Sequence, residues 1–219
     1  MSSTGRNLAS LGNAARNGLL LHHLLGCLQR LGVEIDPFYL LREYPETEER
    51  DKCGIDTAIS SSLLVANDTA AVIAASGPLA TYNQLRDRLG NGHKCVIVKH
   101  EDDAIGYTWI NPHEISHANY RRSLEPDEVY LYGAYILPEF RGRGLAPLMR
   151  AECYRHLRRL GMRRMYSISG LFNTPAIRFK QKLRAEFLAI YLRLKIGPVE
   201  LEPLLVRTYR RFEAGISKS

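Results

Sequence analysis

A short loop rich in glycine and arginine has the residue types that bind a phosphate group. Residues 141–144 read Arg-Gly-Arg-Gly and follow an apolar run that ends before Pro138. Apolar residues at helical spacing come next, so the loop should lie at the N-terminal end of a helix, where free backbone N–H groups converge. Glycine lets the backbone approach an anion closely, arginine adds positive charge, and Ala146 lets the helix pack near the strand. We expect this loop to bind an anionic, phosphorylated ligand.

Two common phosphate-binding motifs do not fit this loop. The chain has no GxxxxGK[ST] sequence of the kind that binds nucleoside triphosphates. It also lacks a GxGxxG sequence with an acidic residue about 20 positions later, as dinucleotide-binding folds require. The loop therefore needs another explanation.

The segment His113-Glu114-Ile115-Ser116-His117 matches the HExxH pattern of zinc hydrolases. In that pattern two histidines one helical turn apart bind the metal, and the glutamate acts as a general base. Pro112 would place the first histidine in the opening turn, and the surroundings are polar. A zinc hydrolase at His113 and His117 is therefore kept only as a remote alternative, and no metal site is expected.

Composition indicates an ordinary folded protein. The chain has 219 residues, 45% of them hydrophobic, and a formal net charge of +7. No run approaches the roughly 20 apolar residues of a membrane-spanning helix, and no signal peptide is evident, so we expect a cytoplasmic protein without integral membrane association. The basic segment 150–164 lacks interleaved aromatic residues, which argues against nucleic-acid binding and favours a solvated face or contact with an anionic partner. Arg150 is expected on that polar face.

The chain is expected to consist of an N-terminal extension and one folded domain. Residues 14–31 have the spacing of an amphipathic helix, which suits a docking helix or a homodimer contact. The charged run 43–52 holds few apolar residues, so the boundary is placed there, with an extension over 1–50 and a domain over 51–219.

The domain is expected to be α+β, with a mixed and largely antiparallel central sheet and helices on both faces. The patterns predict strands over 57–65, 95–99, 105–110, 129–137, 164–169, 187–196 and 201–212, and helices near 68–75, 79–89, 145–160 and 174–183. Residues 111–127 are expected to form a polar link between strands. The run 129–137 is apolar at nearly every position, which places it in the middle of the sheet.

These motifs and their order resemble the GNAT-type, acyl-CoA-dependent N-acetyltransferases. The first family motif is an apolar strand and Pro, then Arg or Gln-x-x-Gly-x-Gly or Ala, matched here by Arg141, Gly144 and Ala146. The second is Asn-x-x-Ala and a helix with an aromatic residue, matched by Asn173, Ala176 and Phe179. The resemblance covers about residues 54–212.

The resemblance implies an acyltransferase that moves an acyl group, most often acetyl, from acyl-CoA to a primary amine by direct attack. The backbone of Ile136 and Leu137 would pair with the pantetheine arm, and the amides of residues 141–146 would hold the pyrophosphate. Asn173 and Phe179 would face the same cofactor. The implied cofactor-binding residues are Ile136, Leu137, Arg141, Gly142, Arg143, Gly144, Leu145, Ala146, Asn173 and Phe179.

The proton-transfer residues are less clearly implied. Many family members carry a tyrosine, which protonates the leaving thiolate, where this chain has Lys180. Lys180 could be that acid, water could replace it, or the site could be weakened. Because residues two apart in a strand share a face, we expect Glu128, Tyr130, Tyr132 and Ile136 on one face of the predicted strand. Glu128 and Tyr132 are the candidate groups to accept the amine's proton. The alternative is that the tyrosines only pack the sheet and that Glu128 is a solvated strand end.

Donor and acceptor remain open in the sequence. A longer acyl-CoA or an acyl carrier protein is an alternative donor, and a catalytically weak acyl-CoA-binding module is an alternative function. The acceptor is expected to be an amine of a small molecule or of a protein, because acceptor pockets of such folds are built from variable loops. Residues 111–125 either line that pocket or form an ordinary surface loop.

Overall fold

The computed structural model describes residues 26–43, 59–63, 82–101 and 103–209. Nine strands in this part of the chain form one sheet, ordered β10-β9-β1-β8-β7-β4-β3-β2, with β11 also pairing with β9. The strands are β1 (Val33–Glu43), β2 (Ile59–Leu63), β3 (Lys94–His100), β4 (Asp103–Asn111), β7 (Glu128–Ile136), β8 (Arg164–Gly170), β9 (Glu186–Ile196), β10 (Val199–Glu200) and β11 (Leu204–Thr208).

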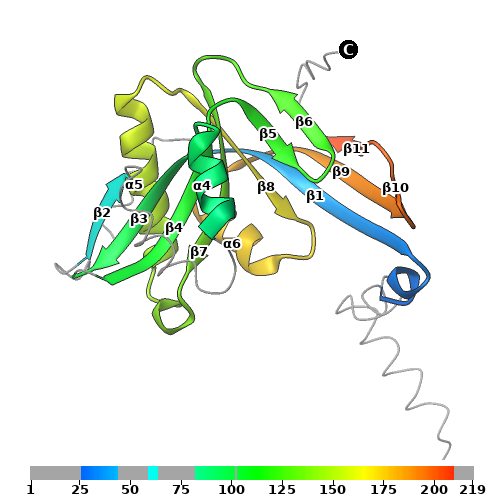
Figure 1. The fold of residues 1–219 in the computed structure, drawn as a ribbon, viewed down its shortest axis with the longest axis horizontal. Helices are drawn as coiled ribbons and strands as arrows, with labels where there is room; N and C mark the ends of the chain where they lie inside the picture. The colour runs from blue at the N-terminus through cyan, green and yellow to red at the C-terminus, as the bar shows by residue number, and fades with distance from the viewer. Residues whose placement is uncertain (1–25, 44–58, 64–81, 102, 210–219) are drawn as a thin grey trace, which may run out of the picture.

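Helices cover both faces of this sheet, as Figure 1 shows. Helix α4 (Tyr82–Gly90) and the hairpin of β5 (Glu114–His117) and β6 (Tyr120–Ser123) lie on one face, which we call the front. Helix α5 (Leu145–Arg159) and helix α6 (Thr174–Lys182) lie on the back. The expected α+β class with a mixed, mostly antiparallel sheet is confirmed.

Most expected elements are present, and one link was misjudged. The predicted helix near 68–75 and most of the predicted helix over 14–31 fall outside the described residues, although residues 26–30 are helical. Residues 111–127, expected to form a polar link between strands, contain the β5–β6 hairpin, in which Ile115 is fully buried. Alternation of Ile115 with polar neighbours over only four residues was too short a signal.

Strands β7 and β8 form a parallel pair that comes apart partway along its length. Four residue pairs link them, from Glu128 with Arg164 to Leu131 with Ser167. Beyond Leu131, β7 continues to Ile136 and β8 to Gly170 without pairing, and Figure 1 shows the two strands diverging. The edge of β7 that faces this gap therefore has backbone groups without a strand partner.

A β-bulge near Gly133 changes which side chains of β7 face the back. Its φ is +58°, and the register with β4 shifts between Tyr107 and Trp109. Val129 and Leu131 pack against α5, and after the bulge Ile136 does so as well. The expectation that Ile136 shares a face with Tyr130 and Tyr132 is thus wrong, because an inserted residue inverts the alternation.

Strand β1 lies within the sheet, between β8 and β9, and is antiparallel to both. The sequence assigned these residues to an extension outside the domain. Pro37 makes this strand hard to recognise in the sequence, because proline is rare in central strands. Its carbonyl accepts a hydrogen bond from the amide of Leu171 at 2.8 Å, past the end of β8, so the missing N–H of Pro37 faces a loop instead of a strand partner.

Replacing Leu40 of β1 with alanine tests whether this strand belongs to the core. Leu40 is fully buried with Tyr130 and Tyr166. We expect Leu40→Ala to lower the free energy of unfolding by about 2–5 kcal/mol. The control Leu204→Ala, at an exposed position of β11, should cost less than about 0.5 kcal/mol. Urea unfolding measures both, and equal small losses would contradict the placement of β1.

Candidate functional site

The glycine-rich loop between β7 and α5 leads directly into the N-terminal end of the helix. Gly142 and Gly144 have φ of +80° and +76°, a conformation that side-chain-bearing residues rarely adopt. Gly144 is the N-cap of α5 and offers no side chain to cap the helix. The first amides of α5 therefore remain available at its positive end, as the sequence predicted for an anion site.

Two arginines flank this loop. The Arg141 Nε donates to the carbonyl oxygen of Ile136 at 3.0 Å, and the guanidinium lies 5.4 Å from the ring centre of Tyr135. The guanidinium of Arg143 lies 5.3 Å from the ring centre of Phe140. Both arginines are exposed, so their positive charge is presented at the mouth of the gap.

Only one of the two residues expected to pair with pantetheine presents its amide to the gap. The amide of Leu137 donates to the carbonyl oxygen of Ile105 in β4 at 2.9 Å, which corrects the expectation for Leu137. Because backbone groups of successive strand residues point in opposite directions, those of Ile136 face the gap. Its carbonyl takes the hydrogen bond from Arg141, and its amide is left for a ligand.

A cluster of buried charges lies behind the sheet, near the point where β7 and β8 part. Glu43, at the end of β1, pairs with Met165 of β8, two residues before the last β7–β8 pair. The Glu43 carboxylate forms ion pairs with Arg150 of α5, at 3.3 Å, and with Lys180 of α6, and it accepts a hydrogen bond from the hydroxyl of Tyr154. Residue exposures of 1% for Glu43 and Arg150 and 3% for Lys180 show that the whole cluster is buried.

Burial and mutual charge shift the pKa values in this cluster. Burial alone would raise the pKa of Glu43, but Arg150 and Lys180 outweigh it and lower the pKa to about 2. Burial and the positive charge of Arg150 lower the pKa of Lys180 to about 8, against the opposing effect of Glu43. Lys180 can thus release a proton far more readily than an ordinary lysine.

The sequence misplaced Arg150 and gave no role to Glu43. Arg150 was expected on the polar face of α5, yet Ala146, Arg150, Cys153 and Leu157 follow the i, i+4, i+7 spacing of one buried stripe, and that spacing was the available signal. Glu43 could not be found from local pattern, because its partners lie 107 and 137 positions away in α5 and α6.

On the front face, Tyr132 lies just before the bulge and contacts residues under both α4 and the hairpin. Its hydroxyl oxygen is 2.6 Å from Nδ1 of His93, a residue that the sequence did not single out. The guanidinium of Arg88 lies 5.5 Å from the ring centre of Tyr132 and 5.1 Å from that of Trp109. Tyr130 stacks on Tyr132 with ring centres 5.5 Å apart.

Glu128 is not brought together with this group. It lies at the start of β7, four residues and about 13 Å along the strand from Tyr132. Its carboxylate pairs with Arg122 at 2.9 Å and Arg164 at 3.1 Å and accepts from the hydroxyl of Tyr166 at 2.9 Å. With these partners and 3% exposure, Glu128 ties β7 to its neighbours instead of facing the gap.

The two residues of the second motif that are expected to face the cofactor, Asn173 and Phe179, are placed differently. The Asn173 side-chain oxygen accepts from the amide of Ala176 at 3.1 Å and thereby caps α6. The ring of Phe179 is half-buried, with its centre 5.3 Å from Nζ of Lys180 and 5.8 Å from the Arg150 guanidinium. Phe179 thus adjoins the charged cluster, whereas Asn173 shapes the loop that follows β8.

The zinc alternative is wrong for a geometric reason. Residues 114–117 form strand β5, so His113 and His117 are not one helical turn apart. His117 lies 3.9 Å from the carboxylate of Asp36 and against the ring of Phe38, whereas His113 lies beside Gly92. Among the described residues, no three His, Cys, Asp or Glu side chains gather as metal ligands would.

No helix in the described ranges has the length and apolar character needed to cross a membrane.

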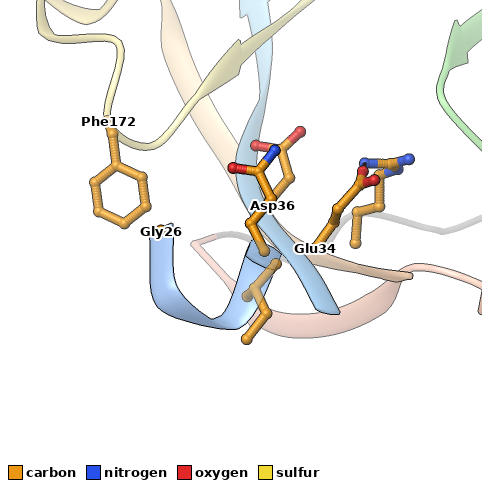
Figure 2. A pocket seen from close by; sticks show the side chains of 7 residues that line it. Gly26, Glu34, Asp36 and Phe172 are labelled. Atoms are coloured by element: carbon orange, nitrogen blue, oxygen red, sulfur yellow. Dashed lines mark hydrogen bonds and ion pairs between the residues drawn. The ribbon is translucent and has the colours of Figure 1, made fainter. Parts of the chain in front are cut away.

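A separate pocket of about 300 Å³ opens at the other end of β1, as Figure 2 shows. Glu34, Asp36, Arg193 and Phe172 are among the residues that line it. Glu34 forms ion pairs with Arg193 at 3.3 Å and Lys195 at 2.8 Å, so its charge is already balanced. The pocket adjoins the loop before α6 but contains none of the site residues expected from the sequence.

Comparison with known proteins agrees with this geometry. The acetyltransferase (GNAT) family matches residues 63–184, which is more than half of the chain. No curated protein sequence matches the chain significantly.

Solved structures of GNAT proteins share the fold. A tandem GNAT protein from the clavulanic acid biosynthesis pathway is 14% identical, with a TM-score of 0.56 over 81% of this chain and 58% of its own. A GCN5-related N-acetyltransferase from Sphaerobacter thermophilus is 15% identical, with a TM-score of 0.53 over 81% of this chain and 58% of its own. A protein of unknown function from Staphylococcus epidermidis is 12% identical, with a TM-score of 0.54 over 80% of this chain and 67% of its own. The chain thus spans little more than half the length of the two named GNAT proteins. Because the family match covers most of the folded part and includes the loop and both motifs, this chain belongs to the GNAT acetyltransferase family.

Proposed function

We propose that the protein transfers an acetyl group from acetyl-CoA to a primary amine by direct attack, without a covalent enzyme intermediate. The observation that carries this proposal is the gap between the parallel strands β7 and β8, with the glycine-rich loop and the N-terminal end of α5 beside it. Family membership supports acyl-CoA-dependent transfer, and the donor's acyl length and the acceptor are part of the proposal.

The donor would lie along the gap on the back of the sheet. Its pyrophosphate would accept hydrogen bonds from the amides of residues 143–146, next to the charges of Arg141 and Arg143. The pantetheine arm would pair with the free amide of Ile136. The thioester would then reach the point where β7 and β8 part, beside Leu131 and Ser167.

Transfer requires a neutral amine and a proton for the departing sulfur. The amine nitrogen attacks the thioester carbon, a C–N bond forms, the C–S bond breaks, and the CoA thiolate leaves. Lys180 would donate a proton to that sulfur and recover it from water. Its pKa of about 8 is close to the value of about 8.5 for a thiol, which suits transfer between the two.

Two substitutions of Lys180 test its role as the acid. Lys180→Met removes the donor, and we expect kcat to fall about a hundredfold. Lys180→Tyr restores a donor with an ordinary pKa of about 10, so activity should return with its alkaline limb moved from about pH 8 to higher pH. Initial rates of CoA release across pH measure this. Equal losses in both variants, or an unmoved limb, would exclude Lys180 as the acid.

A panel of amine acceptors tests the function itself. Acetyl-CoA is offered with amino sugars, amino acids, polyamines and peptides that have a free terminus, and free CoA thiol and acetylated product are both quantified. We expect turnover with at least one amine class. Longer acyl-CoA and acyl carrier protein donors run in parallel. Tight binding of acyl-CoA with no turnover on any amine would favour the alternative of an acyl-CoA-binding module. The ion pair of Lys180 with Glu43 is compatible with that alternative.

A further inference from the structure

The hydrogen bond between Tyr132 and His93 links the front of β7 to the turn between α4 and β3. At 2.6 Å between the Tyr132 hydroxyl and Nδ1 of His93, it is a short contact that holds both side chains. Tyr132 stands directly before the bulge and one residue past the last β7–β8 pair. On β7, it is therefore the front-face side chain nearest to the end of the gap.

The backbone of Tyr132 also connects the front face with the buried cluster behind the sheet. Its carbonyl oxygen accepts from the Thr108 hydroxyl at 3.4 Å, and that hydroxyl accepts from Nη1 of Arg150 at 3.3 Å. The hydroxyl of Tyr132 and the group of Lys180 and Glu43 thus lie on opposite sides of the same short stretch of β7. An amine entering from the front would approach the thioester carbon on the side away from Lys180.

Burial and the neighbouring charges favour the neutral form of the His93 imidazole. Burial, followed by the charges of His113 and Arg88, lowers its pKa below the usual value, while Glu114 has the opposing effect. These groups come from α4 and from the segment that enters β5, and Tyr132 is the neighbour on β7. Burial raises the pKa of Tyr132 to about 12. The phenol consequently keeps its proton near pH 7 and can pass one on only by exchanging it with a neighbour.

We propose that the Tyr132 hydroxyl and the His93 imidazole form the relay through which the attacking amine loses its proton. The inference rests on the proposed acyl transfer. Once the C–N bond has formed, the nitrogen carries an acidic proton, which moves to the Tyr132 oxygen as the Tyr132 proton moves to Nδ1 of His93. Tyr132 is the catalytic residue, and His93 acts through it.

His93 is half-buried, so solvent can reach its imidazole and take up the proton at the end of the relay. The imidazolium that forms is close to Arg88, whose positive charge disfavours it, so it returns the proton to water. Glu128 is not suited to accept the amine's proton, because its carboxylate is bound by two arginines and a tyrosine. His113 is exposed and lies against Gly92 instead of Tyr132.

Three variants test the relay, with wild-type kcat followed from about pH 5 to about pH 8 at saturating acceptor. In the wild type, kcat should fall as pH drops through the pKa of His93. His93→Gln should lower kcat about a hundredfold and abolish that acidic limb. Tyr132→Phe should cause a similar loss. Arg88→Gln removes a cation beside His93, so the limb should move to higher pH by a few tenths of a pH unit while acetyl-CoA binding is kept.

His156→Gln in α5 is the matched control, because it removes a histidine from the opposite face, and it should leave the limb unchanged. A limb that persists in His93→Gln, or that stays fixed in Arg88→Gln, would overturn the relay even though acyl transfer occurs. Absence of turnover in the wild type would instead refute the proposed function. Acetyl-CoA affinity and the thermal midpoint of each variant separate these results from loss of the fold.

Discussion

Substituting Gly144 with valine should abolish acetyl-CoA binding. With φ at +76° as the N-cap of α5, Gly144 is at the turn where the loop amides converge. A branched side chain there would be strained by about 1–3 kcal/mol and would push the loop away from the conformation that presents its amides. We expect the dissociation constant for acetyl-CoA to rise at least about a hundredfold, because the charge-assisted hydrogen bonds to the pyrophosphate would be lost together.

Gly161→Val is the matched control for this substitution. Gly161 has a φ of +81° and lies just past the other end of α5. The backbone strain should therefore be similar, whereas the anion loop is untouched. Isothermal titration calorimetry with acetyl-CoA compares the two variants. Unchanged affinity in Gly144→Val, or the same loss in both, would show that the loop does not hold the cofactor.

Substituting Glu43 with glutamine should cause a large loss of stability. The amide has nearly the same shape, but it leaves Arg150 and Lys180 as two buried positive charges without a counter-charge. Removal of one partner from a buried ion pair typically costs about 3–5 kcal/mol. The control Glu34→Gln, on the same strand in a partly exposed pair, should cost far less, because solvent screens that pair. Urea unfolding curves measure both.

A second substitution distinguishes lost charge balance from lost packing. Lys180→Met in the Glu43→Gln background removes one of the two unbalanced charges, so part of the stability should return. A double variant that is less stable than Glu43→Gln alone would contradict the proposed balance of charges.

The pKa of Glu43 gives a related expectation for pH. Because folding lowers this pKa from 4.5 to about 2, the stabilisation is fully present above pH 4.5 and is lost as pH falls toward 2. The wild type should therefore lose stability in that range, and Glu43→Gln should lose less. Thermal melting across acidic pH measures the difference.

The fold could be predicted to the extent that it depends on local pattern. The apolar run of β7, the stripe of α5 and the spacing of Arg141, Gly144 and Ala146 are all contained in short segments. They determine the anion loop and the order of strands around it. The position of β1 could not be predicted in this way, because its partners, β8 and β9, lie more than 120 residues away, and Pro37 argued against a central strand.

The same distinction between local sequence pattern and tertiary contact applies to the candidate site. The glycine-rich loop proposed to hold the cofactor is predicted from its motif, whereas the groups that would move protons depend on tertiary contacts. His93 and Tyr132 are 39 positions apart, and their contact follows from the order of β3, β4 and β7 in the sheet. The bulge at Gly133 inverts the faces of β7, which no alternation pattern could reveal. Lys180 departs from the family motif in the sequence itself, but only the fold shows its ion pair with Glu43.

Hydrogen–deuterium exchange with and without acetyl-CoA is the most direct test of the central claim that the cofactor lies along the β7–β8 gap. If the account is correct, acetyl-CoA should slow exchange at the amides of residues 143–146 and at Ile136, and to a smaller extent in α6. The amides of β11, at the far edge of the sheet, should exchange at unchanged rates. Bound acetyl-CoA with no protection in the loop, or protection confined to the pocket beside Phe172 and Asp36, would contradict the account.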